Sequence, residues 1–121
     1  MKYALLLYAD EADWDGLDPE AQGEVMAQHG AATEAMQAAG AYVGGEALAP
    51  TNIARTLRLR DGKALVTDGP FIEAKKALGG FYLVECASIN EALDFAARIP
   101  EARTGGVEVR PLLDFGAEAA G

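Results

Sequence analysis

Alternating apolar and polar positions over short stretches of the chain predict a series of strands. Residues 2–9 carry apolar side chains on both alternating sets, which is typical of a strand covered on both faces. Residues 53–60 have one mostly apolar face, and Asp61-Gly62 follows as a two-residue hairpin turn, so residues 63–67 are the expected partner strand. Three further stretches have strand-like composition: residues 41–48, 79–86 and 107–113.

Glycine and proline mark special places in these strands. Gly44-Gly45 interrupts residues 41–48, where we expect a bulge or a close approach of two backbones. Pro111 cannot donate a ladder hydrogen bond, so the last strand is expected to end at a sheet edge or a bulge. Residues 79–86 are rich in aromatic and β-branched side chains, which favours a central strand.

Two stretches with helical spacing separate the strands. The first helix is expected to begin at Asp18, which is followed by proline and glutamate in the first turn, and to end at Gly40. The second begins at a capping box from Ser88 to Glu91, and Pro100 closes it. The residues expected to face the sheet are Val25, His29, Ala32 and Met36 in the first helix, and Ala92, Phe95, Ala96 and Ile99 in the second.

The order of elements is therefore β-α-β, a hairpin and β-α-β, which is the split arrangement of a ferredoxin-like α+β domain with an inserted hairpin. Two helices cover one face of such a sheet, but the strands at 2–9 and 79–86 are apolar on both faces. A second copy of the same sheet is the simplest cover for the other face, so we expect a homodimer. The domain is expected to span residues 1–113, with a frayed tail at 114–121.

Composition narrows the classes of protein. A chain of 121 residues that is 50% apolar can form one core without metals or disulfides. The net charge of −9 opposes binding to nucleic acid and to anionic membranes, and no segment approaches the roughly 20 apolar residues that span a bilayer. The only cysteine, Cys86, is expected to be a buried structural thiol, and the absence of a disulfide favours a cytoplasmic protein.

The loop after the hairpin carries the most specific motif. It contains Asp68-Gly69-Pro70-Phe71, and this tetrapeptide with its flanking sequence closely resembles the DGPF signature of the YCII-related family. The opening MKYALLLY, the run GGFY at 79–82 and the run VRPL at 109–112 also look like that family. The resemblance covers residues 1–113 and implies a dimeric α+β barrel with ferredoxin-like subunits and a cleft beside the sheet.

The family resemblance also implies two kinds of function. In the wider family a histidine–aspartate pair in the cleft has suggested enzymatic activity. Many members with the DGPF motif look like genomic neighbours of extracytoplasmic-function sigma factors, and the motif also occurs fused to such factors. The resemblance therefore implies a fold more strongly than a reaction.

His29 and Asp68 are the candidate catalytic residues. His29 is the only histidine and lies on the core-facing stripe, and a carboxylate can hold an imidazole in one tautomer for general base catalysis. Alternatively, His29 fills a partly polar core position, and Asp68 only accepts backbone hydrogen bonds within its turn.

Four other residues are candidate ligand-binding residues, each with a structural alternative. Phe71 lines the cleft or plugs the seam between subunits, and Arg55 binds a carboxylate or guards an exposed strand. Tyr8 and Tyr82 reach the cleft with their hydroxyls or are core residues with an exposed tip.

Several motifs of cofactor and metal chemistry are absent. The sequence has no phosphate-binding loop, no dinucleotide-binding glycine motif, no C-x-x-C and no H-E-x-x-H, and one histidine with one cysteine cannot form a conventional transition-metal site. We therefore expect neither cofactor nor metal. Two functions remain open: a cofactor-independent enzyme that does acid–base chemistry on a small anionic organic molecule, or a non-catalytic ligand-sensing or regulatory module that binds a sigma-factor-related protein.

Overall fold

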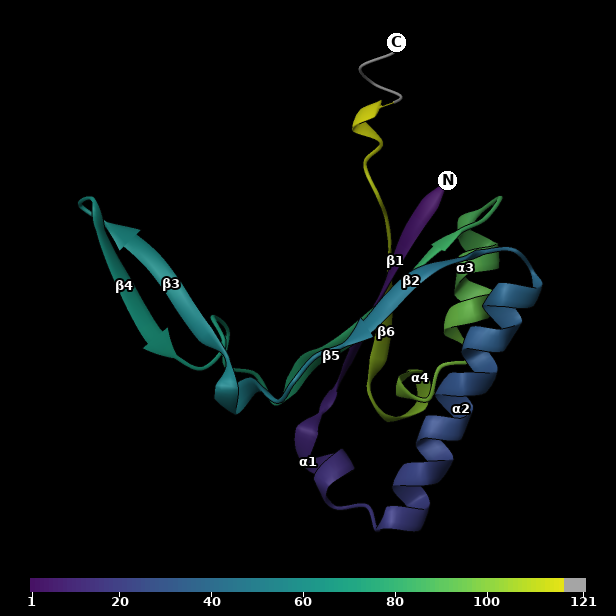
Figure 1. Cartoon of the computed structure of the whole chain (residues 1–121), viewed down its shortest axis with the longest axis horizontal. Coiled ribbons are helices and arrows are strands. Elements are labelled where there is room, and N and C mark those ends of the chain that lie inside the picture. The colour runs from purple at the N-terminus through teal and green to yellow at the C-terminus, as the bar shows by residue number, and fades with distance from the viewer. Residues whose placement is uncertain (117–121) are drawn as a thin grey trace.

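A four-stranded antiparallel sheet organises the chain in the computed structural model, which describes residues 1–116. Its strand order is β2-β5-β1-β6, so β5 and β1 are central (Figure 1). The sheet strands are β1 (Lys2–Asp10), β2 (Tyr42–Ala47), β5 (Lys76–Glu85) and β6 (Gly106–Pro111). The remaining strands, β3 (Arg55–Arg60) and β4 (Lys63–Asp68), form a separate hairpin. The predicted α+β class and the order of strands along the chain are confirmed.

The two predicted helices are present and begin at the predicted caps. The helices that lie wholly within residues 1–116 are α1 (Glu11–Asp15), α2 (Pro19–Ala38), α3 (Ile89–Ala96) and α4 (Glu101–Thr104), with a 3-10 turn η1 (Thr51–Ile53). Asp18 accepts a hydrogen bond from the Ala21 backbone N–H at 2.8 Å, and Ser88 accepts one from the Glu91 N–H at 3.3 Å. We did not predict α1, α4 and η1, because elements of three to five residues are too short to show a hydrophobic period.

The core lies between the sheet and the helices. Figure 1 shows α2, α3 and α4 on one side of the sheet. The predicted stripes do face the sheet, since Ala32 and Met36 of α2 are at most 1% exposed and the four stripe residues of the second helical region are buried. On the helix side of the strands, the buried side chains are Tyr3, Leu5, Leu7 and Val84.

The opposite face of the sheet is less completely covered within one chain, although Ala4 on it is buried. Leu6 pairs with Phe81 across β1 and β5, and Ala4 pairs with Leu83, so these side chains share the face that points away from the helices. Leu6, Phe81 and Leu83 are only partly buried, and Tyr8 on the same face is too. The helix side of β1 is thus covered within one chain, and the other side is the face for which a second copy is the expected cover.

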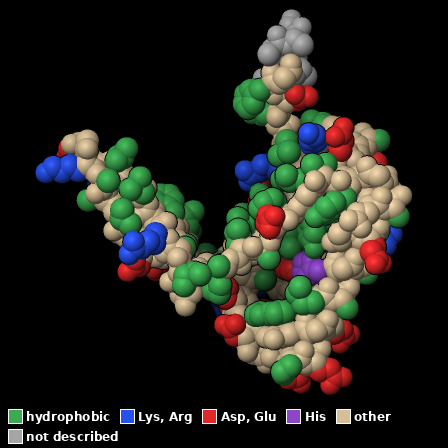
Figure 2. Space-filling view, viewed as in Figure 1, with side chains coloured by type: hydrophobic (Ala, Val, Ile, Leu, Met, Phe, Trp, Pro, Cys, Tyr) green, Lys and Arg blue, Asp and Glu red, His purple; other side chains and the backbone are tan. Residues whose placement is uncertain are grey.

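The β3–β4 hairpin projects from the sheet as an arm, defined here as residues 55–68 (Figure 1). Its turn is the predicted one, because Asp61 and Gly62 both have positive φ, at 52° and 75°. One face of the arm is apolar and exposed, and it consists of Leu57, Leu59, Ala64 and Val66. Hydrophobic side chains on the arm are visible in Figure 2.

The predictions for glycine and proline positions are confirmed. The register of β2 against β5 shifts between Tyr42 and Gly44, and a Cβ on Gly45 would lie only 2.9 Å from the Phe81 carbonyl oxygen. Pro111 lies in β6, which is an edge strand. The predicted frayed tail at 114–121 falls mostly outside the described residues.

Candidate functional site

A cavity of about 560 Å³ lies on the helix side of the sheet, between α2 and strands β1, β2 and β5. Figure 2 shows this hollow, with the histidine side chain visible inside it. Much of its wall is apolar, from residues on four elements and the segment after β2: Leu7, Trp14, Val25, Met26, Leu48, Pro50 and Leu78. A concave, mostly apolar site with a few polar groups is the usual form of a small-molecule site.

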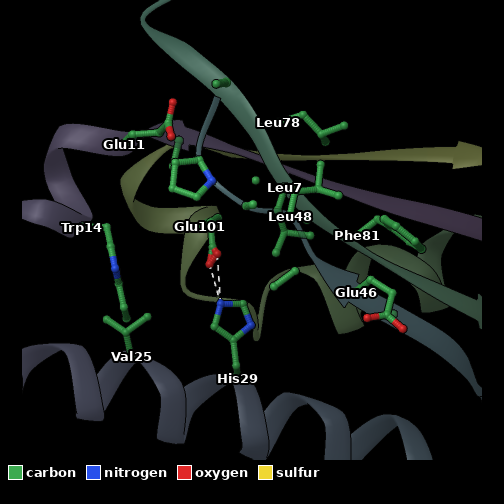
Figure 3. Close-up of a pocket in the computed structure, with 18 of the residues that line it drawn as sticks. Leu7, Glu11, Trp14, Val25, His29, Glu46, Leu48, Leu78, Phe81 and Glu101 are labelled. Carbon is green, nitrogen blue, oxygen red and sulfur yellow. Dashed lines mark hydrogen bonds and ion pairs between the residues drawn. The ribbon is translucent and has the colours of Figure 1, made fainter. Parts of the chain in front are cut away.

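Three polar side chains form a hydrogen-bonded chain at this cavity. His29 Nε2 lies 2.6 Å and 3.0 Å from the two carboxylate oxygens of Glu101, and His29 Nδ1 lies 2.7 Å from the Tyr82 hydroxyl. Figure 3 shows the Glu101 carboxylate above the His29 ring. The His29 and Glu101 side chains are only 19% and 15% exposed, so water screens their interaction weakly.

The hydrogen-bond partners determine the tautomer of the neutral ring. An ionised carboxylate can only accept, so Nε2 carries the hydrogen that is donated to Glu101. Nδ1 then has the lone pair and accepts from the Tyr82 O–H. Because both ring nitrogens are occupied, the group at the end of the chain is the Tyr82 hydroxyl.

The environment raises the pKa of Tyr82 above its ordinary value of about 10. Burial is the largest cause, since it disfavours the phenolate, and the negative charge of Glu101 adds to it. A side-chain hydrogen bond with Thr33 partly opposes these effects. Tyr82 is therefore held as a neutral hydroxyl, which donates a hydrogen bond to His29 Nδ1.

Each member of the chain is positioned by its own element. His29 lies on the core-facing stripe of α2, three residues before the buried Ala32. Tyr82 lies on β5, where it pairs with Leu5 of β1 on one side and with Gly45 of β2 on the other. A Cβ at position 45 would come within 2.9 Å of the tyrosine ring. Glycine at position 45 therefore leaves room for that ring.

Glu101 is the functional residue that we did not predict from the sequence. It is the first residue of α4, and the backbone N–H of Gly105 closes this helix on the Glu101 carbonyl at 2.9 Å. Pro100 indicated the end of a helix, but proline followed by glutamate also suits the start of one. That signal was present, although nothing local indicated His29 as the partner.

The structure does not bring His29 and Asp68 together within one chain, so the predicted pairing is corrected. Asp68 accepts a hydrogen bond from Arg55 Nε at 3.3 Å, and both side chains are at least 72% exposed on the arm. His29 instead pairs with Glu101. The physical reason is that β3 and β4 pair only with each other and leave the main sheet.

The candidate ligand-binding residues divide in the same way. Tyr82 lines the cavity, whereas Tyr8, Arg55 and Phe71 do not. Phe71 is 69% exposed, and the guanidinium carbon of Arg58 lies over its ring, 5.8 Å from the ring centroid. Tyr8 belongs to the face of β1 that points away from the helices.

The Asp, Glu, Lys and Arg residues that line the cavity are all acidic, although the Lys75 ammonium lies 4.0 Å from the carboxylate of one of them, Asp10. Five carboxylate residues contribute to its lining: Asp10, Glu11, Asp15, Glu46 and Glu101. Within residues 1–116, no lysine or arginine lines it. Glu11 is engaged in the wall itself, because its carboxylate accepts from both the backbone N–H and the hydroxyl of Thr51.

Neither a metal cluster nor a membrane span is found in the part of the chain that the structure describes. Among these residues, no three His, Cys, Asp or Glu side chains are placed to hold an ion. None of the described helices combines the length and the apolar character that crossing a bilayer requires.

Comparison with known proteins agrees with the resemblance seen in the sequence. The chain is 44% identical over 114 residues to an uncharacterized protein of Rhizobium meliloti (strain 1021), and the match covers 93% of this chain and 92% of that protein. The YCII-related domain matches residues 1–116, which include every residue of the cavity. The chain therefore belongs to the YCII-related domain family.

Proposed function

We propose that this protein is a cofactor-independent enzyme that moves a proton on a small organic molecule bound in the cavity. The observation that supports this function best is the chain of hydrogen bonds from Glu101 through His29 to Tyr82, with all three residues at one mostly apolar cavity. A base held by a carboxylate, with a polar group at its other nitrogen, is an arrangement suited to general acid–base catalysis.

The proposed step uses Tyr82 as the group that touches the substrate. The Tyr82 oxygen takes a proton from a carbon of the substrate while its own proton passes to His29 Nδ1, 2.7 Å away. The imidazolium that forms is stabilised by the Glu101 carboxylate, and the electron pair left behind moves into the substrate. Return of the proton to a different atom completes an isomerisation, and loss of a leaving group completes an elimination.

The coupling of the two proton transfers follows from the environment of Tyr82. Since burial and Glu101 raise the pKa of Tyr82, a free phenolate is disfavoured, and the hydroxyl must lose its proton to His29 as it gains one from the substrate. The apolar wall keeps water from the reacting atoms, which strengthens each of these hydrogen bonds.

Proton exchange in D₂O tests this function without knowledge of the natural substrate. The protein is incubated with a panel of small enolisable ketones and lactones, and deuterium uptake at carbon is followed by NMR. We expect uptake with at least one compound and a loss of at least about 100-fold in Tyr82→Phe and in His29→Gln, because general acid–base groups contribute factors of this size.

Tyr8→Phe is the matched control. Tyr8 lies outside the cavity and outside the chain of hydrogen bonds, so its change to phenylalanine should leave exchange nearly unchanged. Exchange that survives in both Tyr82→Phe and His29→Gln would contradict the mechanism.

A homodimer is the second part of the proposal. The face of the sheet that carries Leu6, Phe81 and Leu83 is only partly buried in one chain, and the apolar face of the arm is exposed. A two-stranded hairpin alone is at best marginally stable in water, so the arm needs a surface to pack on. A second copy of this chain offers such surfaces around a two-fold axis, as in a dimeric α+β barrel.

The exposed arm also favours a second candidate function, that of a regulatory module. Its apolar face could pack on another protein, and the resemblance to DGPF-type members suggests a sigma-factor-related partner. Co-purification of a sigma factor with the chain, lost in Leu59→Asp on the arm and kept in Tyr82→Phe, would support this alternative over the enzyme.

A further inference from the structure

We propose that the cavity binds an uncharged, largely apolar organic molecule that carries one polar group, and that it rejects the anionic molecule expected from the sequence. The apolar part would lie against Trp14, Val25 and Leu48, and the polar group would meet Tyr82. The position of the polar group rests on the proposed function, whereas the selection against anions rests on the cavity wall alone.

The charge of the lining argues against an anionic ligand. A buried carboxylate or phosphate needs a charged or multiple hydrogen-bond partner to offset its loss of water. Five residues of the lining are acidic, and none of the described lining residues is a lysine or arginine. An anion would lose its hydration and meet a negative field, which the net charge of −9 reinforces.

His29 does not provide the missing cation. Both carboxylate oxygens of Glu101 lie within 3.0 Å of Nε2, so any positive charge on the ring is already balanced. Nδ1 is directed to the Tyr82 hydroxyl and not to open space. A ligand therefore meets a neutral hydroxyl at this end of the cavity.

The acidic residues are also poorly suited to hold a cationic ligand. Glu11 is tied to Thr51, Asp10 caps α1 through the Ala12 N–H, and Glu101 is tied to His29. Three of the five carboxylates thus have partners within the chain, so fewer of their lone pairs can accept from a cationic ligand, and Asp15 and Glu46 are the two that such a ligand would meet. The volume of about 560 Å³ lies within the range of sites for small organic molecules.

Two fluorescent probes that differ by one charge test this inference. N-phenyl-1-naphthylamine is uncharged, and 8-anilino-1-naphthalenesulfonate is the same aromatic amine with an added sulfonate group. We expect the neutral probe to bind the wild-type protein at least ten-fold more tightly in fluorescence titrations. Equal affinity, or tighter binding of the sulfonate, would overturn the inference.

A variant with a new cation in the cavity wall tests whether the two probes bind in this cavity. Leu48→Arg places a guanidinium at the cavity, so the ratio of the two affinities should shift by at least ten-fold toward the sulfonate. Leu93→Arg is the matched control, because Leu93 has the same 47% exposure as Leu48 but lies on α3 outside the cavity. The same shift in both variants would show that the probes bind elsewhere and would overturn the inference.

A third probe separates an uncharged from a cationic ligand. A quaternary-ammonium derivative of the same naphthylamine should bind no more tightly than the neutral amine, because three of the carboxylates are already paired. Clearly tighter binding of this cation would overturn the assignment of an uncharged ligand.

His29→Gln distinguishes failure of this inference from failure of the proposed function. This variant should keep the preference for the neutral probe, since the lining charges are unchanged, while proton exchange falls. If the wild-type protein prefers the neutral probe but catalyses no proton exchange, only the proposed chemistry is overturned. If it catalyses proton exchange but does not prefer the neutral probe, only the proposed ligand class is overturned.

Discussion

At the scale of single residues, the Tyr82 hydroxyl has the most unusual environment of the groups at the cavity. It lies at the end of a chain that begins at a carboxylate, and the pKa of Tyr82 is raised by burial first and by Glu101 after that. In the proposed relay, this hydroxyl passes its proton to His29 as it takes one from the substrate, so no free phenolate forms. Its position therefore matters more than any single charge in the site.

Titration of the tyrosines tests this picture of Tyr82. The chain has four tyrosines, and absorbance at 295 nm should show one that ionises at higher pH than its ordinary value of about 10. Tyr82→Phe should remove this late step. Glu101→Gln should move the step to lower pH, because it removes one of the charges that raise the pKa of Tyr82.

The raised pKa of Tyr82 also makes the stability of the fold depend on pH. The folded state favours the protonated hydroxyl, so the contribution of Tyr82 is complete below the unfolded pKa of about 10 and is lost as pH rises through the folded pKa. Wild type should therefore lose stability to urea above pH 10 more steeply than Tyr82→Phe. Equal slopes for the two proteins would contradict the raised pKa.

At the scale of elements, the short helix α4 has an importance out of proportion to its length. It carries Glu101 to the cavity, and Gly105 closes it just before β6 begins. The backbone of Gly105 lies against β1 so closely that an added Cβ would overlap the Tyr8 carbonyl oxygen and come within 2.9 Å of Ala9 Cα. Contact between the α4 end and β1 thus fixes where Glu101 can lie.

Two neighbouring glycines provide a matched test of α4. Gly105→Ala should destabilise the protein by about 3 kcal/mol, because backbone must move to admit the Cβ. At Gly106 nothing lies within 4 Å of an added Cβ, so Gly106→Ala should cost less than about 1 kcal/mol. Urea unfolding measures both, and similar losses for the two variants would contradict the close contact with β1.

At the scale of the whole molecule, the charges are unevenly distributed. The chain has a net charge of −9, yet the arm holds four cations, Arg55, Arg58, Arg60 and Lys63, against two carboxylates. In the proposed homodimer, the basic arm of one copy would be attracted to the acidic body of the other, in addition to the apolar contact that its Leu57 and Leu59 face could make.

Sedimentation equilibrium tests the dimer. The protein should have about twice its chain mass of 12.7 kDa at micromolar concentration. Leu59→Asp on the arm should weaken the dimer at least ten-fold, whereas Leu93→Asp on α3 should not. A folded wild-type monomer at micromolar concentration would contradict the proposed assembly, and a partner found only in a heterologous complex would favour the regulatory alternative.

Local signals were sufficient for most of the secondary structure. The caps at Asp18 and Ser88 and the turn at Asp61-Gly62 act within four residues, so their hydrogen bonds and dihedral angles depend on neighbours in the sequence. The core-facing stripes also follow from one helix at a time. For the same reason, the periodicity of α2 alone is enough to assign His29 to the buried side of that helix.

The partners of His29 were decided only by the tertiary structure. Tyr82 and Glu101 lie 53 and 72 positions further along the chain, and no local pattern measures such a separation. Asp68 matched the expected chemistry, but the hairpin that carries it leaves the sheet. The sequence by itself thus determined which side chains face the core, because periodicity is a local property. Which polar side chains meet there depended on strand order and on how each segment packs, and these are properties of the whole fold.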